Sequence, residues 1–117
     1  MAEAIVERGD VYRVSYHGTG HELAGPHYAV VITEEPYNRL STLVVIPLSS
    51  GARQASFRPE VMIRGRVTRA LVEQATTIDR SRLRELVASV AGTAAMRQID
   101  ESLRLVLGLD LPESDWI

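Results

Sequence analysis

Short apolar runs, separated by glycine- and proline-rich segments, fill the first two thirds of this chain and confine it to a fold of short strands. The runs contain many β-branched and aromatic residues, which fit the pleated surface of a sheet. Residues 17–26 (HGTGHELAGP) and 49–59 (SSGARQASFRP) carry turn-forming residues, and each predicts a long loop. Strands are predicted at residues 10–16 (DVYRVSY), 28–33 (YAVVIT), 42–48 (TLVVIPL), 60–64 (EVMIR) and 70–73 (ALVE).

The last third of the chain has helical periodicity instead. Thr93 is a favourable N-cap, and Gly108 lies where glycine commonly ends a helix. Between them, apolar residues recur at helical spacing and share one helix face. These residues are Met96, Ile99, Leu103, Val106 and Leu107. A short helix over residues 80–83, capped by Asp79, and a strand over residues 86–90 are predicted before this helix.

Together these elements predict one α+β domain spanning residues 1–117, most simply a small, strongly bent antiparallel sheet with a C-terminal helix. A chain of 117 residues suffices for one hydrophobic core but not for two. The absence of cysteine excludes disulfides, thiolate metal sites and a cysteine nucleophile. The longest apolar run, residues 43–48, is far too short to span a bilayer, and the amino terminus lacks the features of a signal peptide. We therefore expect a soluble cytoplasmic protein.

All 13 basic residues are arginine, although the net charge is only −2. A GC-rich genome explains such a count without any binding site, whereas planar guanidinium groups also suit phosphate and base recognition. The distribution is uneven, because residues 51–69 contain five arginines and a single acidic residue, Glu60. This segment predicts a surface for a polyanion such as nucleic acid, with a solvated charged face as the alternative. Residues 110–117 have the opposite character and are acidic.

All three histidines fall within residues 17–27, and His21 and His27 flank Glu22. Their spacing matches no standard metal site, so no metal is expected. A histidine with a carboxylate in reach is suited to proton transfer near neutral pH, while three exposed loop histidines are the simpler alternative. Ser49 and Ser50 end the strand at residues 42–48, where hydroxyls can bind a phosphate or simply form a turn.

The order of these pieces resembles the MazF/PemK toxin family. Residues 8–12 (RGDVY) and 20–32 (GHELAGPHYAVVI) resemble the family's amino-terminal signature. Residues 44–50 (VVIPLSS) resemble its apolar strand that ends in threonine or serine, and residues 73–83 (EQATTIDRSRL) its E-Q-x-x-x-I-D-x-x-R-L motif. Residues 100–109 are similar to its closing helix. Each motif is weak alone, but four in register over nearly the whole chain are fairly specific.

The resemblance implies an SH3-like antiparallel β-barrel with a short helix and a C-terminal α-helix, as in CcdB/PemK-like toxins. It also implies a homodimer and a type II toxin that cleaves single-stranded RNA at short motifs without a metal or cofactor, by attack of the ribose 2′-hydroxyl. A MazE-like antitoxin with an acidic, disordered tail is the expected partner, since such a tail would be attracted to the arginine-rich segment. For the dimer surface we expect the strand at residues 42–48 and the closing helix.

Carried over by position, the family's catalytic arginine corresponds to His27, its catalytic threonine or serine to Ser49 and its loop acid to Glu22. Histidine supplies no permanent charge, so either His27 acts as a true acid or base, or the activity is weakened or relies on a nearby arginine. Contacts with RNA are expected from His21, Tyr28, Ser50, Arg53 and Arg58. The ring of Tyr28 either stacks on a base or fills the barrel wall.

Two other functions remain open at this point. Toxins of the same barrel include CcdB-like proteins that poison DNA gyrase by binding it, and the histidine at position 27 is compatible with such a protein. A catalytically silent module that binds an antitoxin is the third possibility.

Overall fold

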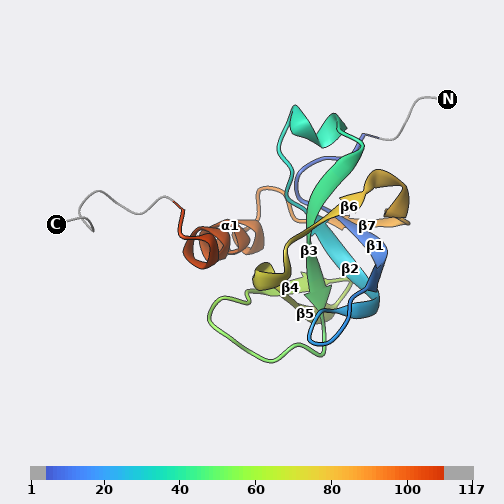
Figure 1. Cartoon of the computed structure of the whole chain (residues 1–117). Coiled ribbons are helices and arrows are strands. Elements are labelled where there is room, and N and C mark those ends of the chain that lie inside the picture. Colours follow the sequence, from blue (N-terminus) through green and yellow to red (C-terminus); the bar gives the residue numbers. More distant parts are fainter. Residues whose placement is uncertain (1–4, 110–117) are drawn as a thin grey trace.

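The computed structural model describes residues 5–109, and within this range the chain forms seven strands, three single-turn 3₁₀ helices and one α-helix (Figure 1). The strands are β1 (Asp10–His17), β2 (Ala24–Val31), β3 (Thr42–Ser49), β4 (Glu60–Ile63), β5 (Arg66–Ala70), β6 (Thr76–Asp79) and β7 (Leu86–Ser89). The 3₁₀ helices are η1 (Tyr37–Arg39), η2 (Val72–Gln74) and η3 (Arg80–Arg82), and the α-helix is α1 (Ala94–Leu107). No helix in this range is long and apolar enough to cross a membrane.

All strands belong to one antiparallel sheet with the order β4-β5-β3-β2-β1-β7, and β6 pairs with the first half of β3. The sheet curls into a nearly closed barrel, and α1 lies to one side of it (Figure 1). The predicted fold class, a small antiparallel barrel with a C-terminal helix, is confirmed. Strand β3 is central, with β2 on one side and β5 and β6 on the other. Most of its side chains are buried in the barrel while Thr42 and Val44 are exposed, so a dimer surface on this strand stays a prediction.

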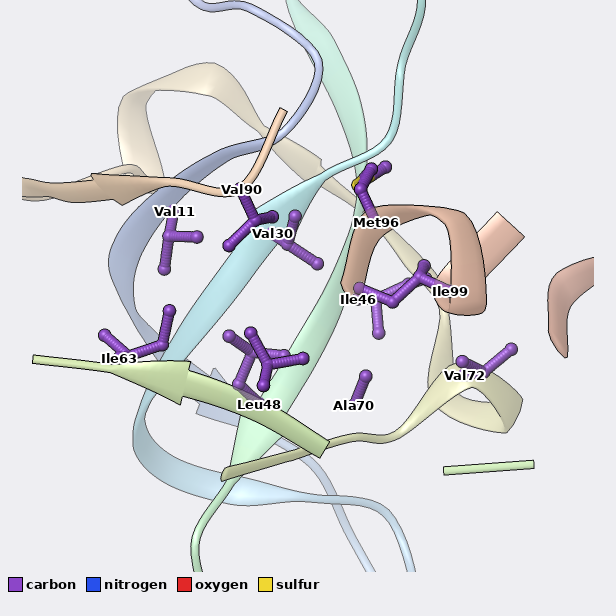
Figure 2. Close-up of a cluster of buried hydrophobic side chains, with 11 residues drawn as sticks. Val11, Val30, Ile46, Leu48, Ile63, Ala70, Val72, Val90, Met96 and Ile99 are labelled. Atoms are coloured by element: carbon purple, nitrogen blue, oxygen red, sulfur yellow. The ribbon is translucent and has the colours of Figure 1, made fainter. Parts of the chain in front are cut away.

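Two apolar clusters cover the opposite faces of the sheet, because successive residues of a strand point to opposite sides. The first cluster lies between the sheet and α1, and Figure 2 shows Met96 and Ile99 of the helix next to sheet residues such as Ile46. The second cluster lies on the other face and is covered by Leu23 and Leu83. Its buried members are Val6, Tyr12, Val14, Tyr16, Ala29, Val31, Leu43, Val45 and Ile78.

Helix α1 begins and ends where its sequence predicts. The hydroxyl of Thr93 accepts a hydrogen bond from the amide of Met96, which satisfies a first-turn donor. Gly108 adopts the left-handed conformation and terminates the helix. Of the predicted apolar face, Met96 and Ile99 are buried and Leu103 is half-buried, but Val106 and Leu107 are exposed. The sheet therefore covers only the first half of the helix.

The largest differences from the predicted elements lie between residues 60 and 79. Arg64 and Gly65 both have positive φ and form the two-residue turn of the β4–β5 hairpin. Strand β5 therefore occupies residues 66–70, whereas the strand predicted at 70–73 is wrong and is replaced by η2. Strand β6 had no predicted counterpart. The loop predicted at 17–26 is also shorter, because β1 extends through His17 and β2 begins at Ala24.

Candidate active site

The candidate site lies where the beginning of β2 meets the end of β3. In the register of these two strands, Tyr28 is opposite Leu48 and Ala29 is opposite Pro47. Continued by one residue beyond its last pair, Tyr28 with Leu48, this register would put His27 opposite Ser49, which is 22 positions away in the sequence.

His27 is half-buried and faces the second apolar cluster. Its ring centroid lies 6.4 Å from that of Tyr16, at an interplanar angle of 59°. Its Nε2 lies 3.2 Å from the carbonyl oxygen of Ala24, within hydrogen-bonding distance. The imidazole is therefore held at the edge of the sheet by one polar and one aromatic neighbour, and it retains exposed surface.

The two adjacent serines differ in their surroundings. Ser49 is the last residue of β3 and is only 6% exposed. Ser50 is exposed and lines a cavity on the other side of the sheet. His27 lines this same cavity, whereas Ser49 lines neither of the two cavities described below.

The loop at residues 18–23 is tightly closed. The amide of Gly18 donates to the carbonyl of Leu23 at 3.1 Å, and the amide of Leu23 donates to Oε1 of Gln74 at 2.8 Å. A Cβ at Gly18 would lie 2.3 Å from the Leu23 oxygen, so this position requires glycine. Glu22 accepts a hydrogen bond from the amide of Thr19 at 3.4 Å, whereas His21 is exposed at the tip. Within residues 5–109, Glu22 thus lies in the loop and forms no hydrogen bond with His27 or Ser49.

A cavity of about 390 Å³ separates this loop from the segment after η2. Its walls include Glu22, Gln74, Arg82 and Tyr16. The hydroxyl of Tyr16 is buried and has no hydrogen-bond partner within residues 5–109. Burial raises the pKa of this hydroxyl, and the nearby Arg82 opposes the shift only in part. The phenol therefore stays neutral and keeps its proton to donate.

A second cavity, of about 230 Å³, lies beside the first cluster. Tyr28 and Ser50 line it together with Arg13 and Arg66, and His27 forms part of its rim. The Arg13 guanidinium lies 5.8 Å from the ring centroid of Tyr28, in cation–π range. Tyr28 packs against the first cluster and also borders this cavity, so its ring is part of the barrel wall and partly accessible.

Ion pairs neutralise much of the arginine-rich segment. Arg58 donates to Oε2 of Glu73 through both Nε, at 2.9 Å, and Nη2. Arg64 lies 3.9 Å from Glu85, and Arg69 lies 3.6 Å from Glu60. Arg53 is exposed and forms no ion pair within the described part of the chain. The charge available to a polyanion is therefore smaller than the count of arginines indicates.

Sequence reasoning missed several residues that line the candidate site. Arg13 and Arg66 border the second cavity, and Tyr16 and Gln74 border the first. Arg69 is paired directly with Ser49 across β3 and β5. Correct placement of β5 would have revealed Arg69, because its alternation with buried Thr68 and Ala70 puts it on the face of Ser49. Residues 5–109 contain no cluster of histidine, aspartate and glutamate able to hold a metal.

The fold is that of the MazF toxins. MazF of Deinococcus radiodurans is 21% identical and superposes with a TM-score of 0.78 over 92% of this chain and 100% of its own. An endoribonuclease of a mycobacterial species, solved in complex with its cognate antitoxin, is 20% identical with a TM-score of 0.67, over 94% of this chain and 100% of that one.

Sequence comparison defines the family more closely. The model of PemK-like and MazF-like toxins of type II toxin-antitoxin systems matches residues 7–107, and the chain therefore belongs to this family. A candidate toxin of Mycobacterium tuberculosis H37Rv is 45% identical over 78 residues, which are 63% of this chain and 71% of that protein. The predicted family membership is confirmed.

Proposed function

We propose that this protein is a sequence-specific endoribonuclease toxin that cleaves single-stranded RNA without a metal. The observation that supports the proposal is the register of β2 and β3, whose last pair is Tyr28 with Leu48; continued by one residue, it would put His27 opposite Ser49 in a sheet of the MazF fold. Two structural neighbours with this fold, both from mycobacterial species, are endoribonucleases. Cleavage of RNA would also place the protein in the cytoplasm.

In the proposed reaction, the ribose 2′-oxygen attacks the adjacent phosphorus, and the bond from phosphorus to the 5′-oxygen breaks. The products are a 2′,3′-cyclic phosphate and a 5′-hydroxyl. The 2′-hydroxyl must lose a proton, the leaving oxygen must gain one, and the phosphoryl oxygens need hydrogen-bond donors. The His27 imidazole accepts the proton of the 2′-hydroxyl, water supplies the proton of the leaving 5′-oxygen, and the Ser49 hydroxyl donates to a phosphoryl oxygen. Glu22 fixes the loop through the amide of Thr19.

The substrate strand is expected to follow the surface between the two cavities. His21 at the loop tip, Tyr28 and Ser50 at the second cavity and Arg53 in the following loop are the proposed contacts with RNA. Arg58 would contribute to RNA binding by holding the loop that carries Arg53, because its Nη1 donates to the carbonyl of Arg53 at 3.1 Å.

Cleavage of mixed-sequence RNA by the purified protein in EDTA tests the proposal. Wild type is expected to cut at a short motif, and His27→Ala is expected to lose most of this activity. Arg39→Ala is the control, since Arg39 is an exposed residue on η1, away from both cavities, and this variant should retain activity. Intact RNA with wild type, or full activity in His27→Ala, would refute these assignments. Co-purification with gyrase subunits and no cleavage would indicate a CcdB-like binding toxin.

The proposed partners are a second copy of the chain and a cognate antitoxin with an acidic tail. Structural neighbours include MazE–MazF complexes of Deinococcus radiodurans. The closing helix is part of the proposed dimer surface. In its last turn, Leu105 is 72% exposed and Leu107 is 58% exposed. Leu107→Glu should shift the protein from dimer to monomer in analytical ultracentrifugation.

A tight complex with the product of the neighbouring gene is expected, and no binding at micromolar concentration would contradict the antitoxin proposal.

A further inference from the structure

Three polar residues form a row across three neighbouring strands. Glu60 of β4 is paired with Arg69 of β5, and Arg69 is paired in turn with Ser49 of β3. Continued by one residue beyond its last pair, Tyr28 with Leu48, the β2–β3 register would bring His27 to the end of this row. The row therefore adds a guanidinium and a carboxylate beside Ser49.

The alternation of each strand puts these residues on a common face. Thr68 and Ala70 are buried on the side of the first cluster, so Arg69 between them points to the opposite side. Leu48 belongs to the first cluster as well, which places its neighbour Ser49 on the side of Arg69. Cross-strand neighbours on one face have Cβ atoms about 5 Å apart, within reach of a long arginine side chain.

The contacts of Arg69 hold its guanidinium in place without using all of its donors. Nη1 donates to the carbonyl of Ala52 at 2.9 Å, which fixes the group beneath the loop that follows Ser49. Nη2 lies 3.6 Å from Oε1 of Glu60, beyond hydrogen-bonding distance. Nε is buried and has no acceptor within residues 5–109. The buried Nε is out of reach of a substrate, so Nη2 is the donor left to a phosphate, and the exposed Glu60 side chain competes for it.

A guanidinium donor that is fixed in place matches the negative charge that develops during phosphoryl transfer. Attack of the 2′-oxygen adds negative charge to the two non-bridging phosphoryl oxygens, and fixed donors at that point lower the barrier. A histidine supplies a lasting positive charge only when protonated, whereas arginine always carries one.

We propose that Arg69 is a catalytic residue of the cleavage proposed above, and that its Nη2 stabilises a phosphoryl oxygen beside Ser49. In the absence of RNA the Glu60 carboxylate lies beside Nη2 of Arg69, and a phosphate of the bound RNA displaces it. This inference rests on the proposed endoribonuclease function. The bonds formed and broken are those already given, and Arg69 remains protonated throughout.

Single-turnover cleavage of a saturating RNA by Arg69→Ala is the principal test. We expect a rate reduction of about 10²–10³-fold, as for the loss of one transition-state donor. Guanidine at millimolar concentration should restore part of the rate, which repair of a purely structural defect would not do. Arg69→Lys should fall between wild type and Arg69→Ala, because it keeps the charge but loses the fixed guanidinium donor. Arg39→Ala, which removes an exposed arginine on η1, is the charge-matched control and should cut at the wild-type rate.

Glu60→Gln supplies a second test that does not depend on the folding of Arg69→Ala. Release of the guanidinium from its competitor should raise kcat/KM several-fold, and the gain should vanish when Arg69→Lys is added. Unchanged cleavage in both Arg69→Ala and Glu60→Gln would overturn the inference while leaving the endoribonuclease function intact. A loss in Arg69→Ala that guanidine does not restore, with no gain in Glu60→Gln, would also overturn it. Failure of wild type to cut RNA would instead refute the proposed function itself.

Discussion

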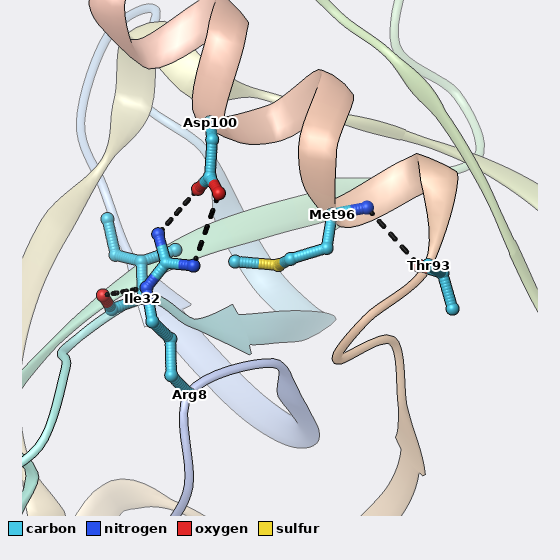
Figure 3. Close-up of polar contacts among 5 residues, drawn as sticks. All are labelled: Arg8, Ile32, Thr93, Met96 and Asp100. Carbon is cyan, nitrogen blue, oxygen red and sulfur yellow. Dashed lines mark hydrogen bonds and ion pairs between the residues drawn. The ribbon is translucent and has the colours of Figure 1, made fainter.

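The guanidinium of Arg8 donates to both carboxylate oxygens of Asp100 and so joins the segment before β1 to the middle of α1 (Figure 3). Its Nε also donates to the carbonyl of Ile32 at 3.0 Å, just after β2. One side chain thus fixes the helix to the sheet at the edge of the first cluster. The first residue of the RGDVY motif therefore has a structural function and lies outside the candidate site.

Loss of this pair should destabilise the protein. Asp100→Asn leaves a guanidinium that is 27% exposed without its charged partner, so the free energy of unfolding should fall by about 1.5–3 kcal/mol. Urea denaturation measures the change. Glu35→Gln is the control, because it breaks a 4.0 Å pair with Arg39 whose side chains are 71% and 79% exposed, and such a pair contributes at most about 0.5 kcal/mol. Equal losses of unfolding free energy in the two variants would show that the Arg8–Asp100 pair does not hold the helix to the sheet.

Gly9, the second residue of the RGDVY motif, also packs closely against a distant part of the chain. Gly9 has a φ of +96°, and an added Cβ would lie 2.8 Å from the backbone nitrogen of Ala91. Gly9→Ala should therefore cost at least about 2 kcal/mol, through strain and the displacement of Ala91. Gly51→Ala is the control, since Gly51 has no positive φ and no atom near its Cβ position. A melting temperature for Gly9→Ala equal to that of wild type would contradict this account.

The sequence predicted the elements whose signals are local. Thr93 and Gly108 mark both ends of α1, and Asp79 caps η3 through the amide of Ser81. The hairpin was misread because Arg64 and Gly65 form its turn, and arginine is uncommon at a position with positive φ. Once that turn is missed, β5 shifts by several residues. The error at residues 70–73 is thus a consequence of one unusual turn residue.

The candidate site was predictable only as a set of residue types. His27 and Ser49 were found by resemblance, but their proximity depends on the pairing of β2 with β3. Arg58 was predicted to face RNA, and the sequence gives no sign that Glu73, 15 positions away, pairs with it. Arg69 is absent from the site residues predicted from the sequence for the same reason, because its position next to Ser49 depends on the pairing of β3 with β5. Ion pairs and strand register are long-range properties, and one sequence does not encode them as a local pattern.

The unpartnered hydroxyl of Tyr16 predicts an unusual substitution. A buried hydroxyl without a partner costs about 1–3 kcal/mol, so Tyr16→Phe should leave stability unchanged or raise it by about 1 kcal/mol. Tyr12→Phe is the matched control in the same cluster, and it should lose about 1 kcal/mol, because the Tyr12 hydroxyl bonds to Asp10. Thermal unfolding compares the two. A larger loss for Tyr16→Phe than for Tyr12→Phe would contradict the prediction.

Asp79 should make stability depend on pH in the acidic range. The Ser81 hydroxyl, and then the Ser81 amide, donate to its carboxylate and lower the pKa of Asp79. A carboxyl whose pKa is lower in the folded state stabilises the fold above its unfolded pKa of about 3.9, and this stabilisation disappears as pH falls through the folded value. Wild type should therefore melt above Asp79→Asn at pH 6, and the difference should shrink towards pH 3. A constant difference across this range would contradict the assignment.

The two serines at the end of β3 should separate catalysis from binding. Ser49 is paired with Arg69 across β3 and β5, whereas Ser50 opens onto the second cavity. Ser49→Ala should reduce the single-turnover rate about 10²-fold, because it removes a donor to the phosphoryl oxygens, with little change in KM. Ser50→Ala should raise KM by a few-fold and leave the rate at saturation unchanged, since its hydroxyl would contact only bound RNA. Steady-state and single-turnover cleavage of one oligonucleotide distinguish the two, and an exchange of these effects would place the reacting phosphate on the other face of the sheet.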